Sequence, residues 1–97
     1  MYTITAYTRE IANEYGVEVA PSDRKGKKIK VTDGDRVFHL GDISRLDFAT
    51  MLVRCENGEM SIEEANERQK RFYKRFFKAA QEYRSGAYWV SKLLWLL

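Results

Sequence analysis

An uninterrupted stretch of helix-compatible residues in the second half of the chain constrains the fold most. Ser61 and Glu64 have the spacing of a capping box, and neither glycine nor proline follows until Gly86. This pattern predicts one long amphipathic helix over residues 61–84. At 100° per residue its apolar side chains share one face, which we expect to be core: Ile62, Ala65, Phe72, Tyr73, Phe76, Ala80 and Tyr83.

The first half of the chain predicts a β-hairpin. Ile29 and Val31 alternate with lysines, and Asp33-Gly34 is a turn signal before a returning strand over residues 37–40. A hairpin alone is marginal in water, so we expect a third strand over residues 17–19 and a covering helix. A basic loop and this hairpin would occupy residues 22–42.

Three further segments complete the expected architecture. Residues 1–21 would contain a helix that ends at Gly16, although residues 1–5 are also compatible with an edge strand. Residues 43–58 would form a short helix capped by Asp42, and residues 87–97 an apolar C-terminal helix. We therefore expect one α+β domain over residues 1–97, with a small antiparallel sheet packed against the long helix.

Composition excludes several classes of protein. The chain has 97 residues, 17 Lys+Arg and 14 Asp+Glu. Cys55 is the one cysteine and lacks companions at metal-ligand spacing, so we expect a reducing compartment, no disulfide and no cofactor. The first ten residues do not resemble a secretory signal, so we expect a protein that is not secreted. The terminal apolar run is too short for a bilayer-spanning helix.

Two basic clusters are candidates for contact with nucleic acid. Residues 67–84 carry seven basic and two acidic side chains, and we expect the basic ones opposite the aromatic face. An alternative is a solvated face held by Glu–Arg pairs four residues apart, and the lysines of the hairpin also discourage aggregation. The candidate phosphate contacts are Lys25, Lys27, Lys28, Lys30, Arg71, Lys74, Arg75 and Lys78.

Catalytic patterns are poor, and we expect a protein that is not an enzyme. His39 is the one histidine and lies on a predicted strand, where packed or surface positions are common. No neighbouring base is evident for Cys55. Turn chemistry accounts for Asp33 and Asp35.

Five motifs occur in a characteristic order and spacing: RKGKKIKV (24–31), VFHLGD (37–42), DF (47–48), ERQKRFYKRF (67–76) and SGAYWVSKLLW (85–95). Together they resemble a small uncharacterised domain encoded by tailed phages and large DNA viruses. The resemblance covers residues 22–97, but residues 49–61 are longer than the usual connection, and Arg75-Phe76 replaces a common arginine-histidine pair. It implies a viral protein that acts in the virion or the host cytoplasm.

Three functions are compatible with these features. The first is a virion-associated or structural protein that docks on viral or host subunits, or on a second copy of itself, through its C-terminus. The second is a nucleic-acid-binding module, and the third an inhibitor of a host defence complex. The C-terminal run is equally compatible with a place in the core of the monomer. The candidate interface residues are Trp89, Leu93, Leu94, Trp95, Leu96 and Leu97.

Overall fold

The N-terminal segment folds as a capped helix. The structure, a computed structural model, describes residues 2–97. Helix α1 (Ala6–Tyr15) begins after Thr5, whose side chain accepts a hydrogen bond from the Thr8 amide, and ends at Gly16 with a φ of 71°. The predicted helix is confirmed. Residues 2–5 form no strand, so the edge-strand alternative is wrong for them, and Met1 lies outside the described residues.

Three strands form the sheet, in the order β1-β2-β3 and antiparallel throughout. They are β1 (Glu18–Pro21), β2 (Lys27–Asp33) and β3 (Arg36–Asp42). Asp33 pairs with Arg36, so Gly34 and Asp35 make a two-residue turn, with φ of 63° at Gly34. The predicted hairpin and the existence of a third strand are confirmed, although that strand begins at Glu18 and includes Pro21 rather than covering residues 17–19. With the helices they give the expected α+β class.

Helix α2 (Phe48–Glu56) begins later than the sequence pattern predicted. Its N-cap is Asp47, which accepts a hydrogen bond from the Thr50 amide. Asp42, the predicted cap, instead accepts hydrogen bonds from the amide and hydroxyl of Ser44. Residues 43–47 therefore form a connection with its own turn, because Asp42 is satisfied locally.

The long helix α3 (Ile62–Ala80) begins as predicted, with the Ser61 hydroxyl accepting from the Glu64 amide. It ends at Ala80 rather than at Arg84. Most of its predicted core face is exposed, because Ala65 and Phe72 are its only buried residues. The expectation that the whole aromatic stripe is core is therefore wrong. The exposed fractions are 44% for Ile62, 48% for Tyr73, 41% for Phe76 and 70% for Tyr83.

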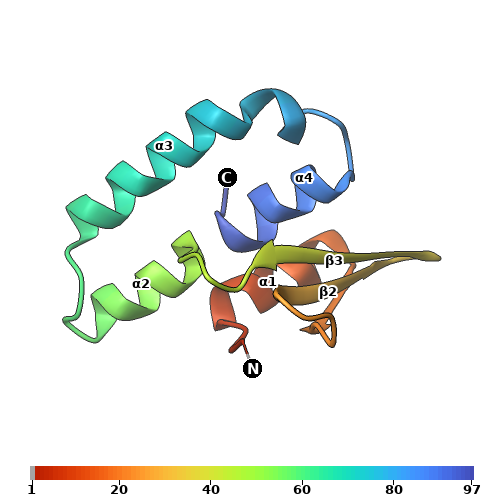
Figure 1. Ribbon diagram of the computed structural model, residues 1–97, viewed down its shortest axis with the longest axis horizontal. Helices are drawn as coiled ribbons and strands as arrows, with labels where there is room; N and C mark the ends of the chain where they lie inside the picture. Colours follow the sequence, from red (N-terminus) through yellow and green to blue (C-terminus); the bar gives the residue numbers. More distant parts are fainter. Residues whose placement is uncertain (1) are drawn as a thin grey trace.

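The C-terminal segment fills the space that α3 leaves. Helix α4 (Gly86–Trp89) continues directly into the π-helix η1 (Val90–Leu94). In Figure 1 this segment lies between α3 and the layer formed by α1 and the sheet. Trp89 and Leu93 are fully buried, and Trp89 meets Tyr15 edge-on at 5.7 Å between ring centroids. The main apolar cluster is Ile4, Ala12, Val17, Ile29, Val31, Leu40, Trp89, Leu93 and Leu94.

A second, smaller apolar cluster lies between α2 and α3. Phe48, Met51 and Ala65 are its buried members, and Trp95 packs against both clusters. Since α3 contributes so few buried side chains, its position depends largely on this small contact and on Trp95. Within residues 2–97, no helix has both the length and the apolar character needed to cross a membrane.

Candidate functional site

A groove of about 720 Å³ runs between α3, the β3–α2 connection and the C-terminal segment. Arg45 reaches it from the connection, and three arginines reach it from α3. The other side chains are mostly apolar, so the groove combines cationic groups with an apolar surface. Its lining residues are Lys28, Gly41, Asp42, Arg45, Leu46, Met51, Arg68, Arg71, Phe72, Arg75, Phe76, Val90, Leu94 and Trp95.

The helical spacing of α3 brings its arginines and aromatic rings to the same groove. Arg68, Phe72 and Phe76 are four residues apart, and Arg71 and Arg75 repeat that interval one position earlier. The expectation that all basic residues of this helix lie opposite its aromatic residues is therefore wrong. Arg45, Arg68, Phe72 and Phe76 are not among the predicted site residues, although the interleaved spacing of arginines and aromatic residues on α3 is visible in the sequence.

Three aromatic rings form a continuous stack along the groove. Trp95 stacks on Phe72 with ring centroids 4.3 Å apart and an interplanar angle of 5°. Phe72 stacks in turn on Phe76, at 4.4 Å and 17°. The Gln69 side chain donates a hydrogen bond to the Trp95 carbonyl at 2.9 Å, which fixes the first member of the stack. Phe76 is 41% exposed, and the Arg75 guanidinium lies over its ring at 5.7 Å from the centroid, so the stack ends at the surface beside a cation.

The arginines of the groove are only weakly neutralised. Arg68 lies 3.1 Å from Glu64, and Arg71 lies 3.8 Å from Glu67. Arg45 lies 3.8 Å from Asp42. All three are exposed pairs, which contribute little energy and are readily exchanged for another anion. Arg75 has no carboxylate partner within 4.0 Å anywhere in residues 2–97, so its charge is not neutralised by an acidic side chain.

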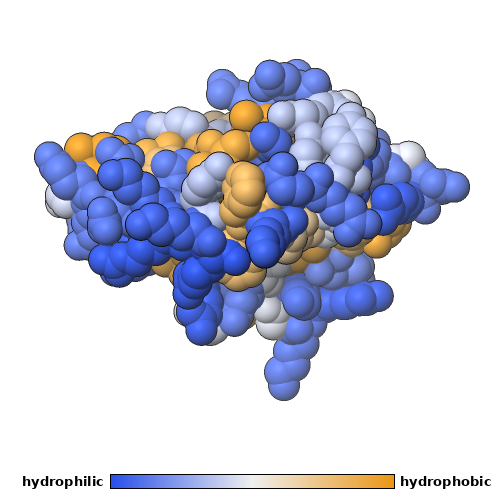
Figure 2. All heavy atoms as spheres, turned by 90° about the horizontal axis from the view of Figure 1, so that it is seen from above, coloured by the Kyte–Doolittle hydropathy of each residue, from blue (hydrophilic) through white to orange (hydrophobic). Residues whose placement is uncertain are grey.

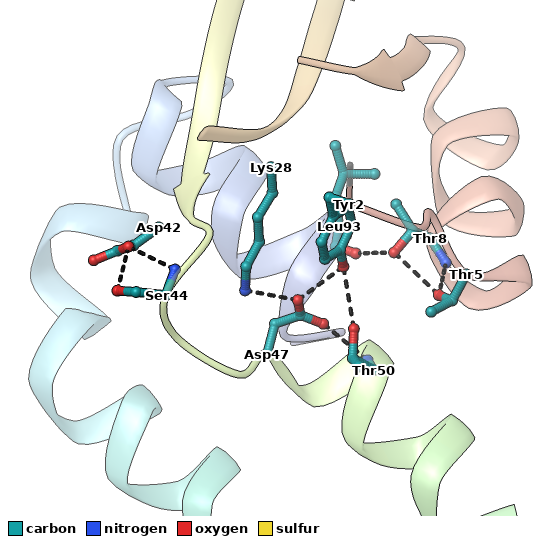
Figure 3. Close-up of polar contacts among 9 residues, drawn as sticks. All are labelled: Tyr2, Thr5, Thr8, Lys28, Asp42, Ser44, Asp47, Thr50 and Leu93. Carbon is teal, nitrogen blue, oxygen red and sulfur yellow. Dashed lines mark hydrogen bonds and ion pairs between the residues drawn. The ribbon is translucent and has the colours of Figure 1, made fainter. Parts of the chain in front are cut away.

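Lys28 supports the groove from below rather than lying on the surface. It is 4% exposed, and its ammonium group donates to Asp47 at 2.8 Å (Figure 3). Tyr2 donates a hydrogen bond to the same carboxylate, also at 2.8 Å. Burial and the adjacent Asp47 carboxylate raise the pKa of the Tyr2 phenol, so it remains a donor. The interpretation of Lys28 as an exposed phosphate contact is therefore wrong, because its charge is used inside the fold.

Gly41 allows the strand, Lys28 and the C-terminal helix to meet beneath the groove. A Cβ atom at this position would lie 2.9 Å from Leu94 Cδ1 and 3.0 Å from Lys28 Cδ. The φ of 85° is also unfavourable for any other residue. The glycine therefore permits a close approach that a side chain would prevent.

The other predicted phosphate contacts lie apart from this groove. Lys25 and Lys27 are exposed where the loop enters β2, and Lys30 borders a different groove beside α1. Lys74 and Lys78 are exposed on α3 and do not line the groove. Among the eight predicted positions, the structure thus brings together only Arg71 and Arg75, with Lys28 buried below them.

The six predicted interface residues of the C-terminus divide into two groups. Trp89, Leu93 and Leu94 are at most 1% exposed and hold the core together. Trp95, Leu96 and Leu97 remain partly exposed. The alternative that this run completes the core of the monomer accounts for the first three residues only.

A serine, a histidine and an aspartate meet beside the sheet, but their geometry is not that of a catalytic triad. Ser22 Oγ lies 2.8 Å from Nδ1 of His39, and Asp23 lies 3.9 Å from the same nitrogen. A triad needs the two partners on different ring nitrogens. The Ser22 hydroxyl also accepts from the Arg24 amide, so this contact orders the loop. No cluster of three metal-ligating side chains occurs within the part of the chain that the structure describes.

Comparison with protein-family models, with curated proteins and with solved structures found no match to this chain. The groove is therefore the feature of this chain that bears on its function. Its cationic groups and its exposed ring suit a ligand that combines negative charge with flat apolar groups.

Proposed function

We propose that this chain is a non-enzymatic binding protein and that its groove holds single-stranded nucleic acid. The observation that carries the proposal is the Trp95–Phe72–Phe76 stack, which ends on an exposed ring between arginines. Single-strand binding sites combine a basic groove for the backbone with aromatic rings on which bases stack.

The chemistry of the groove favours a strand over a duplex. The bases of a duplex are already stacked on one another, so their faces are closed to Phe76. Phosphates of a flexible strand can approach Arg45 on one side of the groove and the three arginines of α3 on the other, which makes four cationic contacts. We therefore expect weaker binding to a duplex of the same length.

The test is fluorescence anisotropy with a labelled twelve-nucleotide homopyrimidine strand, titrated with the wild-type chain at several salt concentrations. We expect the logarithm of the affinity to fall with the logarithm of the salt concentration, with a slope of about −3 if four phosphates are contacted. The double variant Arg71→Gln/Arg75→Gln should lose about half of this slope and bind more weakly.

The matched control is Lys74→Gln/Lys78→Gln, which removes the same charge from α3 outside the groove. This variant should retain most of the wild-type affinity. Equal losses in the two double variants would contradict the groove as the binding site, and an absence of binding at low salt would contradict the function.

Docking on another protein subunit is the second candidate function. Trp95, Leu96 and Leu97 support it, because they remain partly exposed and belong to residue types that anchor interfaces or pack in them. A virion subunit is the partner that this hypothesis predicts. Its test is the double variant Leu96→Ser/Leu97→Ser, which leaves the buried Leu93 and Leu94 in place; a variant that still enters purified virions would contradict it.

A further inference from the structure

A smaller hollow, of about 210 Å³, adjoins the groove between α3 and the C-terminal segment. Phe72 and Phe76 border both spaces, so two rings of the aromatic stack separate the hollow from the groove. Figure 2 looks onto α3 and shows orange apolar side chains exposed between the blue charged ones. The groove and the hollow are therefore neighbouring parts of one surface.

The hollow has an exposed rim and a buried inner wall. Tyr73 and Phe77 border it from the flank of α3 that does not line the groove, and at 48% and 43% exposed they form the rim. Phe72 is 5% exposed, and Tyr88 and Leu97 are partly buried, so these three form the inner wall. An apolar cavity of about 150 Å³ is large enough for benzene, so the hollow has room for one six-membered ring.

The inner wall also contains a buried hydroxyl group without a partner in the chain. Ser91 borders the hollow and is 7% exposed. Its Oγ forms no hydrogen bond with any of residues 2–97. Buried polar groups are normally hydrogen-bonded, because a bond that is not made costs stability. The hydroxyl is therefore available to a polar ligand that enters the hollow.

Lys92 brings a positive charge to the same hollow. Its ammonium nitrogen lies 5.6 Å from the centroid of the Tyr88 ring, and no carboxylate lies within 4.0 Å of it among residues 2–97. An ammonium group only donates hydrogen bonds, whereas a serine hydroxyl both donates and accepts. Ser91 and Lys92 together therefore suit a carbonyl oxygen next to a ring nitrogen.

We propose that the hollow binds one carbonyl-bearing nucleobase of the strand, an inference that rests on the proposed function of the groove. The base lies against the inner wall, its carbonyl oxygen accepts from Lys92, and its ring nitrogen pairs with the Ser91 hydroxyl. Thymine, uracil, cytosine and guanine have a carbonyl oxygen beside a ring nitrogen, whereas adenine has an amino group instead. The hollow therefore discriminates against adenine, and a pyrimidine fits it with a single ring.

A strand in the groove reaches the hollow without leaving its phosphate contacts. Phe76 borders both spaces and is 41% exposed, so the strand crosses from one to the other at this ring. Stacking alone tolerates every base, since every base has a flat face. Base selectivity is therefore a property of the hollow, and salt dependence is a property of the arginines.

The first experiment compares labelled thymidine and deoxyadenosine strands of equal length by fluorescence anisotropy. We expect the wild type to bind the thymidine strand at least about ten-fold more tightly. Ser91→Ala and Lys92→Met should each lose most of this preference. Ser91→Ala should also keep the wild-type melting temperature, because the hydroxyl has no partner in the free chain. The control is Thr3→Ala, which removes an exposed hydroxyl that does not border the hollow and should retain the preference.

A free nucleoside separates this inference from the function of the groove, because it carries no phosphate for the arginines. Thymidine should shift the amide NMR signals of Ser91 and Lys92 in the isotope-labelled chain, and adenosine should shift them less. If neither strand binds at low salt, such shifts would support the hollow while contradicting the proposed function, and their absence would overturn both. If the strands bind, equal affinity for the two, or a preference that survives in Ser91→Ala, would overturn the hollow alone.

Discussion

Arg84 donates two hydrogen bonds to the carboxylate of Asp33, one from Nε at 2.9 Å and one from Nη2 at 3.0 Å. The pair joins the end of β2 to the loop between α3 and α4, and a third bond of 3.4 Å reaches the Tyr15 carbonyl. Arg84 has a φ of 57°, which is unfavourable for a residue with a side chain. The hydrogen bonds of the guanidinium therefore stabilise this strained backbone conformation at Arg84, just before α4 begins.

We predict that Arg84→Lys lowers the melting temperature by about 5 °C. A lysine retains the charge but cannot form two parallel hydrogen bonds with one carboxylate. Thermal unfolding followed by circular dichroism measures the change. The control is Arg24→Lys in the exposed loop, which should melt like the wild type; an unchanged melting temperature for Arg84→Lys would contradict the structural role.

Acid should weaken this same connection. The Arg84 guanidinium holds the pKa of the Asp33 carboxyl below its ordinary value, so the ionised form is favoured in the folded state. The resulting stability is complete above the ordinary pKa of an aspartate, about 3.9, and is lost as the pH falls through the lower folded value.

The difference in urea midpoint between wild type and Arg84→Ala should therefore be constant from pH 7 to about pH 5 and shrink below about pH 4. Chemical unfolding at a series of pH values provides the measurement. A difference that persists unchanged at pH 2 would show that the contribution of Arg84 does not involve the ionised carboxylate.

Removing the carboxylate of Asp47 should be severe. Asp47→Ala leaves Lys28 charged and buried without a partner, for which the expected loss in the free energy of unfolding is about 3–5 kcal/mol. The loss of the α2 cap adds to it. Urea unfolding measures the change, with Asp42→Ala in the exposed turn as the milder control.

The double variant Lys28→Met/Asp47→Asn distinguishes this explanation from a general sensitivity of the region. No uncompensated charge remains in the double variant. Its loss in the free energy of unfolding should therefore be smaller than the sum of the losses measured for Lys28→Met alone and Asp47→Asn alone. Simple additivity would mean that the two side chains do not interact energetically.

The stack in the groove predicts a loss of affinity without a change in salt dependence. Phe76→Ala should weaken binding of the homopyrimidine strand by about 1–3 kcal/mol, because one base loses its stacking surface and no phosphate contact is removed. Anisotropy titrations at three salt concentrations test both parts. Phe77→Ala, which removes an equally exposed ring from the other flank, is the control.

Much of the fold was readable because its signals are local. Asp33-Gly34 fixes a two-residue turn, Gly16 ends α1, and the Ser61 hydroxyl caps α3, each through chemistry confined to neighbouring residues. The start of α2 was misread because Asp42 and Asp47 both precede helix-compatible residues. Only the three-dimensional arrangement, in which Lys28 and Tyr2 reach Asp47, distinguishes them.

The candidate site was predicted only in part, because it depends on which surface each element covers. The aromatic face of α3 matches the pattern of a core helix, but the C-terminal segment covers little more of it than Phe72. The alternation of lysine with apolar residues predicts an exposed position for Lys28. Its ammonium group is instead buried against Asp47, which lies 19 residues away in the sequence. Neither the exposed face of α3 nor the burial of Lys28 can be predicted from neighbouring residues in the sequence.

The two tryptophans give the molecule a built-in optical reporter. Trp89 is fully buried in the main cluster, so its emission should be blue-shifted and insensitive to anything outside the protein. Trp95 is partly exposed and borders the groove in face-to-face contact with Phe72. A change in emission when the groove is occupied therefore originates from one indole, and occupancy is measurable on the unlabelled chain.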